Sequence, residues 1–211
     1  MKRFITAIGI MGLAISISSC HKRDNYYVQP APTGYQYSFD DNFDYDAHNW
    51  SFTDNVNSAY VSISNGILKY QYTPTGDGSN TVAVNTGADV DHNFLIQTRI
   101  RSDYEMGIVF GVNNSNYGYS FVIDNSNGQF AVFSEGSNTS AISTLVNWTA
   151  SSAIQSGWND VEMEQVGDKW TGYINGTKVF DIPAHYLEGT KIGFIDIAGT
   201  TGYADYLTVQ W

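Results

Sequence analysis

The fold is decided by residues 94–135, FLIQTRIRSDYEMGIVFGVNNSNYGYSFVIDNSNGQFAVFSE. Apolar and polar side chains alternate along four short runs in this stretch, and turns rich in Asn, Ser and Gly separate most of the runs. Such alternation is typical of strands that bury one face of a sheet. The stretch therefore predicts four consecutive antiparallel strands over one hydrophobic core.

A specific register follows from this pattern. If residues 94–101 pair with 105–112, then Ile100 faces Met106, and the next two turns bring Phe121 opposite both Ile108 and Val132. Phe94 and Phe110 then lie on the same face as these side chains. Four strands agree on one apolar face, which we take as the core.

The opposite face of this meander is floored by small residues, among them Gly107, Gly111 and Gly118. Glycine inside a strand often marks a place where another group approaches the backbone closely. Arg99 on the first strand and Phe133 on the fourth would wall a shallow trough above these glycines. Either the two side chains simply cover the glycines, or the trough holds a ligand.

A sugar presents an apolar face and a rim of hydroxyl groups, so its site needs an aromatic surface beside charged or amide groups. The trough would supply both. We therefore expect carbohydrate binding on this face, with the neighbouring hairpin as the other location for the site. The residues expected to bind are Gln97, Arg99, Glu105, Ser120, Phe133, Glu135, Glu162 and Tyr173.

The neighbouring hairpin is predicted from residues 161–166 and 169–174, which turn at Gly167-Asp168. A second turn follows at Asn175-Gly176, a strong signal for a two-residue hairpin loop. Alternation places Val161 and Met163 on the core face. Trp170 falls on that face as well, so we interpret it as a packing residue.

Composition and charge restrict the class of protein. The 211 residues include 20 glycines, only four prolines and 15% aromatic side chains, which favours an all-β protein. The formal net charge of -11 would repel a phosphate backbone, so we exclude nucleic acid as a partner. With a single cysteine the chain can form no intramolecular disulfide.

The N-terminus has the pattern of a secretory signal: Lys2 and Arg3 precede an uncharged stretch at residues 4–17. This stretch is shorter than the roughly 20 apolar residues that cross a membrane. We predict a signal peptide at residues 1–19, a flexible tether at 20–36 and one β-sandwich domain at 37–211. Pro30, Pro32 and Gly34 mark the tether.

The sequence Ile17-Ser18-Ser19-Cys20 resembles the lipobox of bacterial lipoproteins. That resemblance implies that Cys20 becomes the acylated N-terminus and anchors the protein in a lipid bilayer. The next residue is His21 rather than the aspartate that the lipoprotein family uses for inner-membrane retention. By resemblance, the expected location is the cell envelope, at the outer membrane of a Gram-negative bacterium.

Landmarks along residues 39–209 carry a second resemblance. They are FDDNF at 39–43, NGIL at 65–68, WN at 158–159, YING at 173–176 and YADYLTV at 203–209. In this order they are similar to concanavalin A-like lectin and glucanase domains, particularly the laminin-G-like and 3-keto-disaccharide-hydrolase types. The resemblance implies a two-sheet antiparallel jelly-roll sandwich with adjacent first and last strands. It also implies a concave face that binds or cleaves glycans in many relatives.

Three carboxylates, Asp160, Glu162 and Glu164, alternate along one predicted strand and so project from one face. Their spacing is similar to the E-x-D-x-E strand of family 16 glycoside hydrolases, but the first and the central residue both differ from that pattern. An acidic solvated strand face explains them equally well. We therefore assign no catalytic residue.

Metal chemistry has little support in the sequence. The four histidines are scattered without ligand spacing. The pairs Asp40-Asp41 and Asp89-Asp91 could hold calcium, but turn formation accounts for these aspartates too. We therefore assign no cofactor and keep calcium as an alternative.

Three functional classes remain. A membrane-anchored, non-catalytic glycan-binding lipoprotein fits the signal, the trough and the fold resemblance. The alternatives are a glycoside hydrolase or related sugar-cleaving enzyme, and a protein-binding adhesion or assembly component. The sequence names no particular glycan and no oligomeric state.

Overall fold

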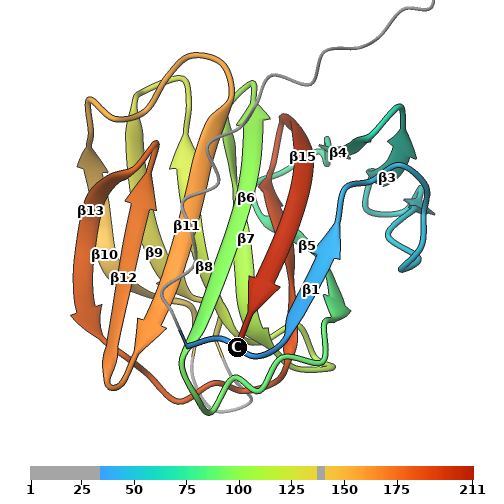
Figure 1. Cartoon of the computed structure of the whole chain (residues 1–211). Coiled ribbons are helices and arrows are strands. Elements are labelled where there is room, and N and C mark those ends of the chain that lie inside the picture. Colours follow the sequence, from blue (N-terminus) through green and yellow to red (C-terminus); the bar gives the residue numbers. More distant parts are fainter. Residues whose placement is uncertain (1–33, 137–140) are drawn as a thin grey trace, which may run out of the picture. The chain divides into compact units, whose positions relative to one another are not determined.

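The computed structural model describes residues 34–136 and 141–211, which form two antiparallel sheets packed face to face (Figure 1). The nine-stranded sheet has the order β13-β12-β11-β6-β15-β4-β3-β2, and β1 pairs with β15. The six-stranded sheet has the order β10-β9-β8-β7-β14-β5. This confirms the all-β, two-sheet sandwich of jelly-roll type. Within the described ranges, we find no helix with the length and apolar character that a membrane span requires.

The strands of the nine-stranded sheet are β1 (Ser38–Asp41), β2 (Phe52–Asp54), β3 (Ala59–Ser64), β4 (Ile67–Tyr72), β6 (Phe94–Ser102), β11 (Asn159–Val166), β12 (Lys169–Ile174), β13 (Thr177–Pro183) and β15 (Thr200–Gln210). Those of the six-stranded sheet are β5 (Ser79–Asn85), β7 (Glu105–Val112), β8 (Tyr119–Asp124), β9 (Gln129–Ser134), β10 (Ser143–Ala150) and β14 (Lys191–Ile197). The Ala- and Ser-rich stretch at 141–156 contains β10.

The core lies between the sheets and is built from alternate residues of both. Aromatic rings fill much of it: Phe121 lies 5.0 Å from Phe180 and Phe110 lies 5.1 Å from Trp170, centroid to centroid, both edge to face. Such pairs add stability beyond the area that they bury. Trp170 is fully buried, which confirms its packing role.

Most of the register expected from the sequence is confirmed. Ile108 pairs with Phe121 across β7 and β8, and Phe121 pairs with Val132 across β8 and β9. The hairpin β11–β12 pairs Val161 with Ile174 as expected. The following turn is also confirmed, with positive φ at both Asn175 (50°) and Gly176 (74°), the conformation that a two-residue hairpin of this sequence favours.

The expected pairing of residues 94–101 with 105–112 is wrong. β6 pairs with β11 and β15 in the nine-stranded sheet, whereas β7 pairs with β8 and β14 in the six-stranded sheet. The loop at residues 103–104 therefore carries the chain from one sheet to the other. Phe94 and Phe110 still meet in the core, 6.3 Å apart, but they meet across the sandwich instead of along one sheet.

The first and last strands are adjacent, as the family resemblance implied. Phe39 of β1 pairs with Val209 of β15. Backbone contacts begin even earlier, since the amides of Gln36 and Tyr37 both donate to the carbonyl oxygen of Trp211, at 2.9 and 3.1 Å. Gln36 belongs to the stretch that the sequence assigns to the tether.

Candidate functional site

The structure divides the eight expected binding residues between opposite sides of the sandwich. The outer face of the nine-stranded sheet carries Gln97 and Arg99 of β6, Glu162 of β11 and Tyr173 of β12. The outer face of the six-stranded sheet carries Glu105, Ser120 and Phe133, with Glu135 directly after β9. The expectation that Gln97 and Arg99 share one trough with the other set is wrong, because β6 and β7 belong to different sheets. Glu162 and Tyr173, which were expected on the neighbouring hairpin, lie on the same face as Gln97 and Arg99.

The outer face of the six-stranded sheet has a filled floor. Val109, Val122 and Ile195 are at most 1% exposed and form a small hydrophobic cluster of their own, against which Phe133 packs. Phe133 also contacts Trp148 edge to face, with the centroids 5.8 Å apart. The floor side chains are therefore already in contact with other protein groups.

The glycines of this face serve the sheet itself. A Cβ atom added at Gly107 would lie 2.2 Å from the carbonyl oxygen of Phe121, and one added at Gly193 would lie 2.1 Å from that of Val82. Neighbouring strands thus approach too closely for any side chain at these positions. Valine at Gly107 would therefore disturb the fold instead of merely filling a trough.

Two polar residues of this face bond to each other. The hydroxyl of Ser120 donates to Glu135, and burial raises the pKa of that carboxyl although the hydrogen bond opposes the shift. Glu105 lies on the same face, where burial, followed by the charge of Asp124, raises its pKa. This face therefore carries a few polar groups on a largely apolar floor.

The outer face of the nine-stranded sheet is polar and half-buried. We call Asp160, Glu162 and Glu164 of β11, together with Gln97, Arg99 and Tyr173 beside them, the acidic strip. Gln97 donates to Glu162 at 2.8 Å, and the Arg99 Nε atom lies 3.7 Å from the Asp160 Oδ1 atom. The strand register dictates both contacts, because Glu162 is opposite Gln97 and Asp160 is opposite Arg99.

All three carboxyls of the acidic strip have raised pKa values. Burial is the main cause in each case. The Gln97 hydrogen bond opposes the rise at Glu162, the Arg99 charge opposes it at Asp160, and the charge of Glu162 adds to it at Glu164. Carboxyl groups of this kind are suited to hydrogen bonding with hydroxyl groups.

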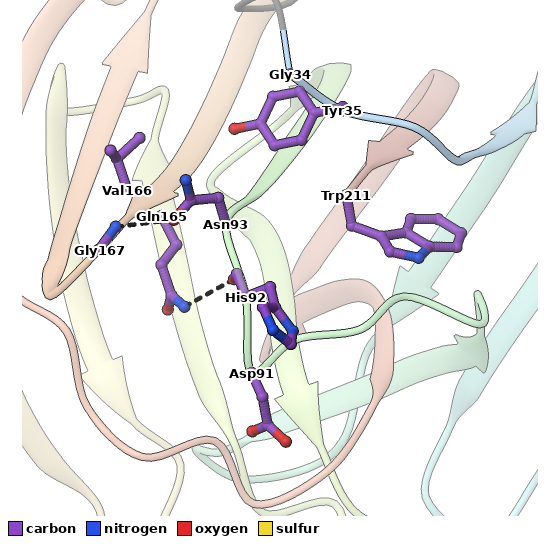
Figure 2. A pocket seen from close by; sticks show the side chains of 9 residues that line it. All are labelled: Gly34, Tyr35, Asp91, His92, Asn93, Gln165, Val166, Gly167 and Trp211. Atoms are coloured by element: carbon purple, nitrogen blue, oxygen red, sulfur yellow. Dashed lines mark hydrogen bonds between the residues drawn. The ribbon is translucent and has the colours of Figure 1, made fainter.

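An open pocket of about 480 Å³ adjoins the strip, at the end of β11 and beside the start of β6 (Figure 2). The rings of Tyr35 and Trp211 provide aromatic walls, while Asn93, Asp91 and Gln165 supply amide and carboxylate groups. The volume lies within the range of small-molecule sites.

The polar floor of the pocket is held in place by hydrogen bonds within the protein. Gln165 accepts from the Trp170 Nε1 atom at 2.7 Å and donates to the His92 carbonyl oxygen at 2.9 Å. Asn93 accepts from the Gly167 amide at 2.8 Å. Because these partners come from core residues and turns, the floor is rigid before any ligand arrives.

Tyr35 connects the pocket with the acidic strip. Burial, followed by the charges of Glu164 and Glu162, raises its pKa to about 12. The two carboxylates are therefore near enough to act on the Tyr35 hydroxyl. We take the pocket and the acidic strip together as the candidate site.

Sequence reasoning missed the pocket residues. Tyr35 falls in the stretch assigned to the tether, and Trp211 follows the last strand, so neither takes part in an alternating pattern. Gln165 carried a signal, since it is a polar residue in phase with Val161 and Met163 on the core face. Such a residue needs buried partners, and these partners build the pocket floor.

Two of the aspartates considered for calcium, Asp41 and Asp89, have partners within the protein. Asp41 accepts from the Trp50 Nε1 atom at 2.8 Å and from the Phe43 amide at 2.9 Å. Asp89 lies 2.9 Å from the His92 Nδ1 atom. Within residues 34–136 and 141–211, no group of three or more His, Cys, Asp or Glu residues could hold a metal ion.

Comparisons with known proteins show the fold. No family model matches the chain, and no curated protein matches it. Among solved structures it is similar to the carbohydrate-binding module CBM66 from Bacillus subtilis (14% identity, 77% of this chain and 92% of that one, TM-score 0.50). It is also similar to the CBM2 module of the evolved Dit protein of Lactobacillus casei BL23 phage J-1 (14% identity, 84% and 97%, TM-score 0.56).

A third similar structure is a sialidase, with 16% identity and a TM-score of 0.54. The match covers 81% of this chain but only 18% of the sialidase chain, so it concerns one part of that enzyme. At these identities the likeness establishes the sandwich architecture, and function has to be argued from the site.

Proposed function

We propose that this protein is a lipid-anchored cell-envelope protein whose sandwich binds a glycan on the outer face of the nine-stranded sheet without cleaving it. The pocket is the observation that carries the proposal. It sets the rings of Tyr35 and Trp211 beside the amide and carboxylate groups of Asn93 and Asp91. Sugars need this combination of an apolar surface and hydroxyl partners.

The acidic strip extends the site along β11. Glu162, Glu164 and Tyr173 offer further hydrogen-bonding groups for hydroxyls, and Tyr35 connects them with the pocket. Two of the similar solved structures are described as carbohydrate-binding modules, which supports a glycan as the ligand. The lipobox at residues 17–20, outside the described residues, supports the anchor.

Hydrolysis is the second candidate, and the partners of the carboxylates argue against it. A retaining glycosidase needs two carboxyls about 5 to 5.5 Å apart, so the short side chain of Asp160 would have to converge on Glu164 across roughly 13 Å of strand. Asp160 is next to Arg99, and Glu162 accepts from Gln97. The strip therefore suits binding better than acid–base catalysis.

A glycan array probed with the full chain in detergent tests the proposal. Trp211→Ala and Tyr35→Ala should each weaken the best-bound glycan by about tenfold or more, since each removes a large aromatic contact. Trp148→Ala, a partly exposed aromatic on the other sheet, is the matched control and should bind as the parent does. If no glycan binds, or if only Trp148→Ala loses binding, the proposal fails.

A further inference from the structure

The few positive charges of this protein are unevenly placed. Six lysines and arginines lie in the described residues, and three of them, Lys69, Arg99 and Arg101, lie at one end of the outer face of the nine-stranded sheet. On the same sheet, Lys169 and Lys178 both pair with Asp181, at 3.2 and 3.6 Å. On an otherwise acidic protein, such a group of cations is a candidate site for an anionic ligand.

Arg101 is held by two aromatic rings. Its guanidinium carbon lies 4.5 Å from the ring centroid of Tyr203 and 5.0 Å from that of Trp158. Arg101 is nevertheless exposed, and among residues 34–136 and 141–211 it has no ion pair. The rings restrict the side chain, so little further rotamer entropy is lost when its N–H groups bind a ligand.

The support beneath Arg101 is rigid. Tyr203 pairs with Arg101 on one side and with Lys69 on the other, so the three residues form a row across β6, β15 and β4. Trp158 precedes β11, and the fully buried Asn159 fixes its loop by donating to the Gly157 carbonyl oxygen at 3.2 Å. We call Arg101, Trp158, Tyr203 and Lys69 the cationic clamp.

Nearby carboxylates leave the clamp unneutralised. Asp160 lies against Arg99, 3.7 Å from its Nε atom, and Asp205 acts on Asp160 electrostatically. Neither carboxylate forms an ion pair with Arg101 or Lys69 in the part of the chain that the structure describes. The planar fork of an arginine matches the geometry of a carboxylate or a sulfate.

We propose that the cationic clamp binds an anionic substituent, a carboxylate or a sulfate, on the glycan that the acidic strip and pocket hold. This inference rests on the proposed glycan-binding function. Asn159 and Gln165 bracket the strip on β11, so clamp and pocket are roughly 20 Å apart along the strand, far enough to engage different residues of one chain. The neutral part of the glycan lies toward Tyr35 and the charged part at Arg101.

Calorimetric titration of the full chain in detergent with matched ligand pairs tests the inference. The probes are oligogalacturonate against its methyl ester, and dextran sulfate against dextran, so that one arm reports on carboxylate and the other on sulfate. At least one anionic probe should bind about tenfold or more tightly than its neutral counterpart, as expected for hydrogen bonds between charged groups. High salt should reduce this preference.

Single substitutions test whether the preference for the anionic probes comes from the cationic clamp. Arg101→Gln should abolish the preference for the anionic probe and Trp158→Ala should reduce it, whereas Lys178→Gln, which removes the same charge elsewhere on this sheet, should keep it. Equal affinity for both members of each pair, or a preference that survives Arg101→Gln, overturns the inference. Binding of the neutral probes that Trp211→Ala weakens would still support the glycan-binding function, so the two failures are distinguishable.

Discussion

At the scale of single residues, Asp196 is the most unusual group of the core. It follows Ile192 and Phe194 in phase on β14, so its carboxyl points between the sheets, where it is fully buried. Among the residues that the structure describes, neither carboxylate oxygen finds a hydrogen-bond partner. Burial, followed by the charge of Asp103, raises its pKa well above the usual value. The alternation of residues 192–196 carried this signal in the sequence, but nothing there showed that the carboxyl lacks partners.

Asp196→Asn should therefore stabilise the protein near neutral pH. The pKa of Asp196 in the folded protein lies above its unfolded value of about 3.9. The contribution of Asp196 to stability is therefore full below about pH 3.9 and is lost as the pH rises toward the folded pKa. The variant should gain about 1 to 3 kcal/mol at pH 7 to 8, and the gain should shrink as the pH approaches 4. Urea unfolding across this pH range measures it.

Asp181→Asn is the matched control for this experiment. Lys169 holds the pKa of the exposed Asp181 below its usual value. The contribution of Asp181 to stability is therefore present above the unfolded pKa and is lost as the pH falls through the folded pKa. The pH trend of this variant should have the opposite sign. A destabilised Asp196→Asn at pH 8 would show that the carboxyl has a partner that we have not identified.

At the scale of elements, the hairpins could be predicted from sequence and the change of sheet could not. Asn-Gly and Gly-Asp turns between alternating runs specify β11, β12 and β13, because turn and pattern require the same register. The loop at 103–104 is short enough for a hairpin, and an apolar face suits a strand in either sheet. Only the partners of β6, which lie far away in the sequence, exclude the hairpin.

The same limit applied to the site. The sequence assigned Gln97 and Arg99 to the correct face of their own strand. It also placed them beside Phe133, which the structure puts on the opposite side of the sandwich. Their actual neighbours, Glu162 and Asp160, are more than 60 residues away, and no local pattern could have paired them.

The register within the six-stranded sheet predicts contrasting effects of two truncations. Phe121→Ala should lower the free energy of unfolding by about 3 to 5 kcal/mol, because the ring is fully buried against Phe130 and Phe180. Thr171→Ala, on the outer face of β12, should change it by about 0.5 kcal/mol or less. Chemical denaturation of both variants checks this, and similar losses would contradict the assignment of core and outer faces.

The acidic strip predicts an absence of hydrolysis. The full chain should release no reducing sugar from laminarin or mixed-linkage glucan, because Asp160 and Glu162 are each engaged by a neighbouring side chain. Activity that persists in the exposed-loop variant Glu188→Gln but vanishes in Glu164→Gln would show that the strip is catalytic after all.

At the scale of the whole molecule, the lipobox-like sequence at residues 17–20 leads to a prediction about where the protein is located. The parent chain should partition with membranes, and Cys20→Ala should be released or mislocalised, since the acyl chains supply the membrane affinity. Fractionation of cells that express both proteins, with mass spectrometry of the mature N-terminus, checks this. An uncleaved and unmodified N-terminus would contradict it.

The route by which the chain joins the sandwich has a mechanical consequence. Gly34 and Tyr35 line the pocket, and the next two residues are bonded to the carbonyl oxygen of Trp211. Tension applied to the chain ahead of Gly34 therefore loads the pocket wall before it loads the core. Peeling the wall away would lower affinity, and by linkage an occupied pocket would resist peeling. A sandwich tethered through this segment would bind its ligand more tightly at rest than under shear.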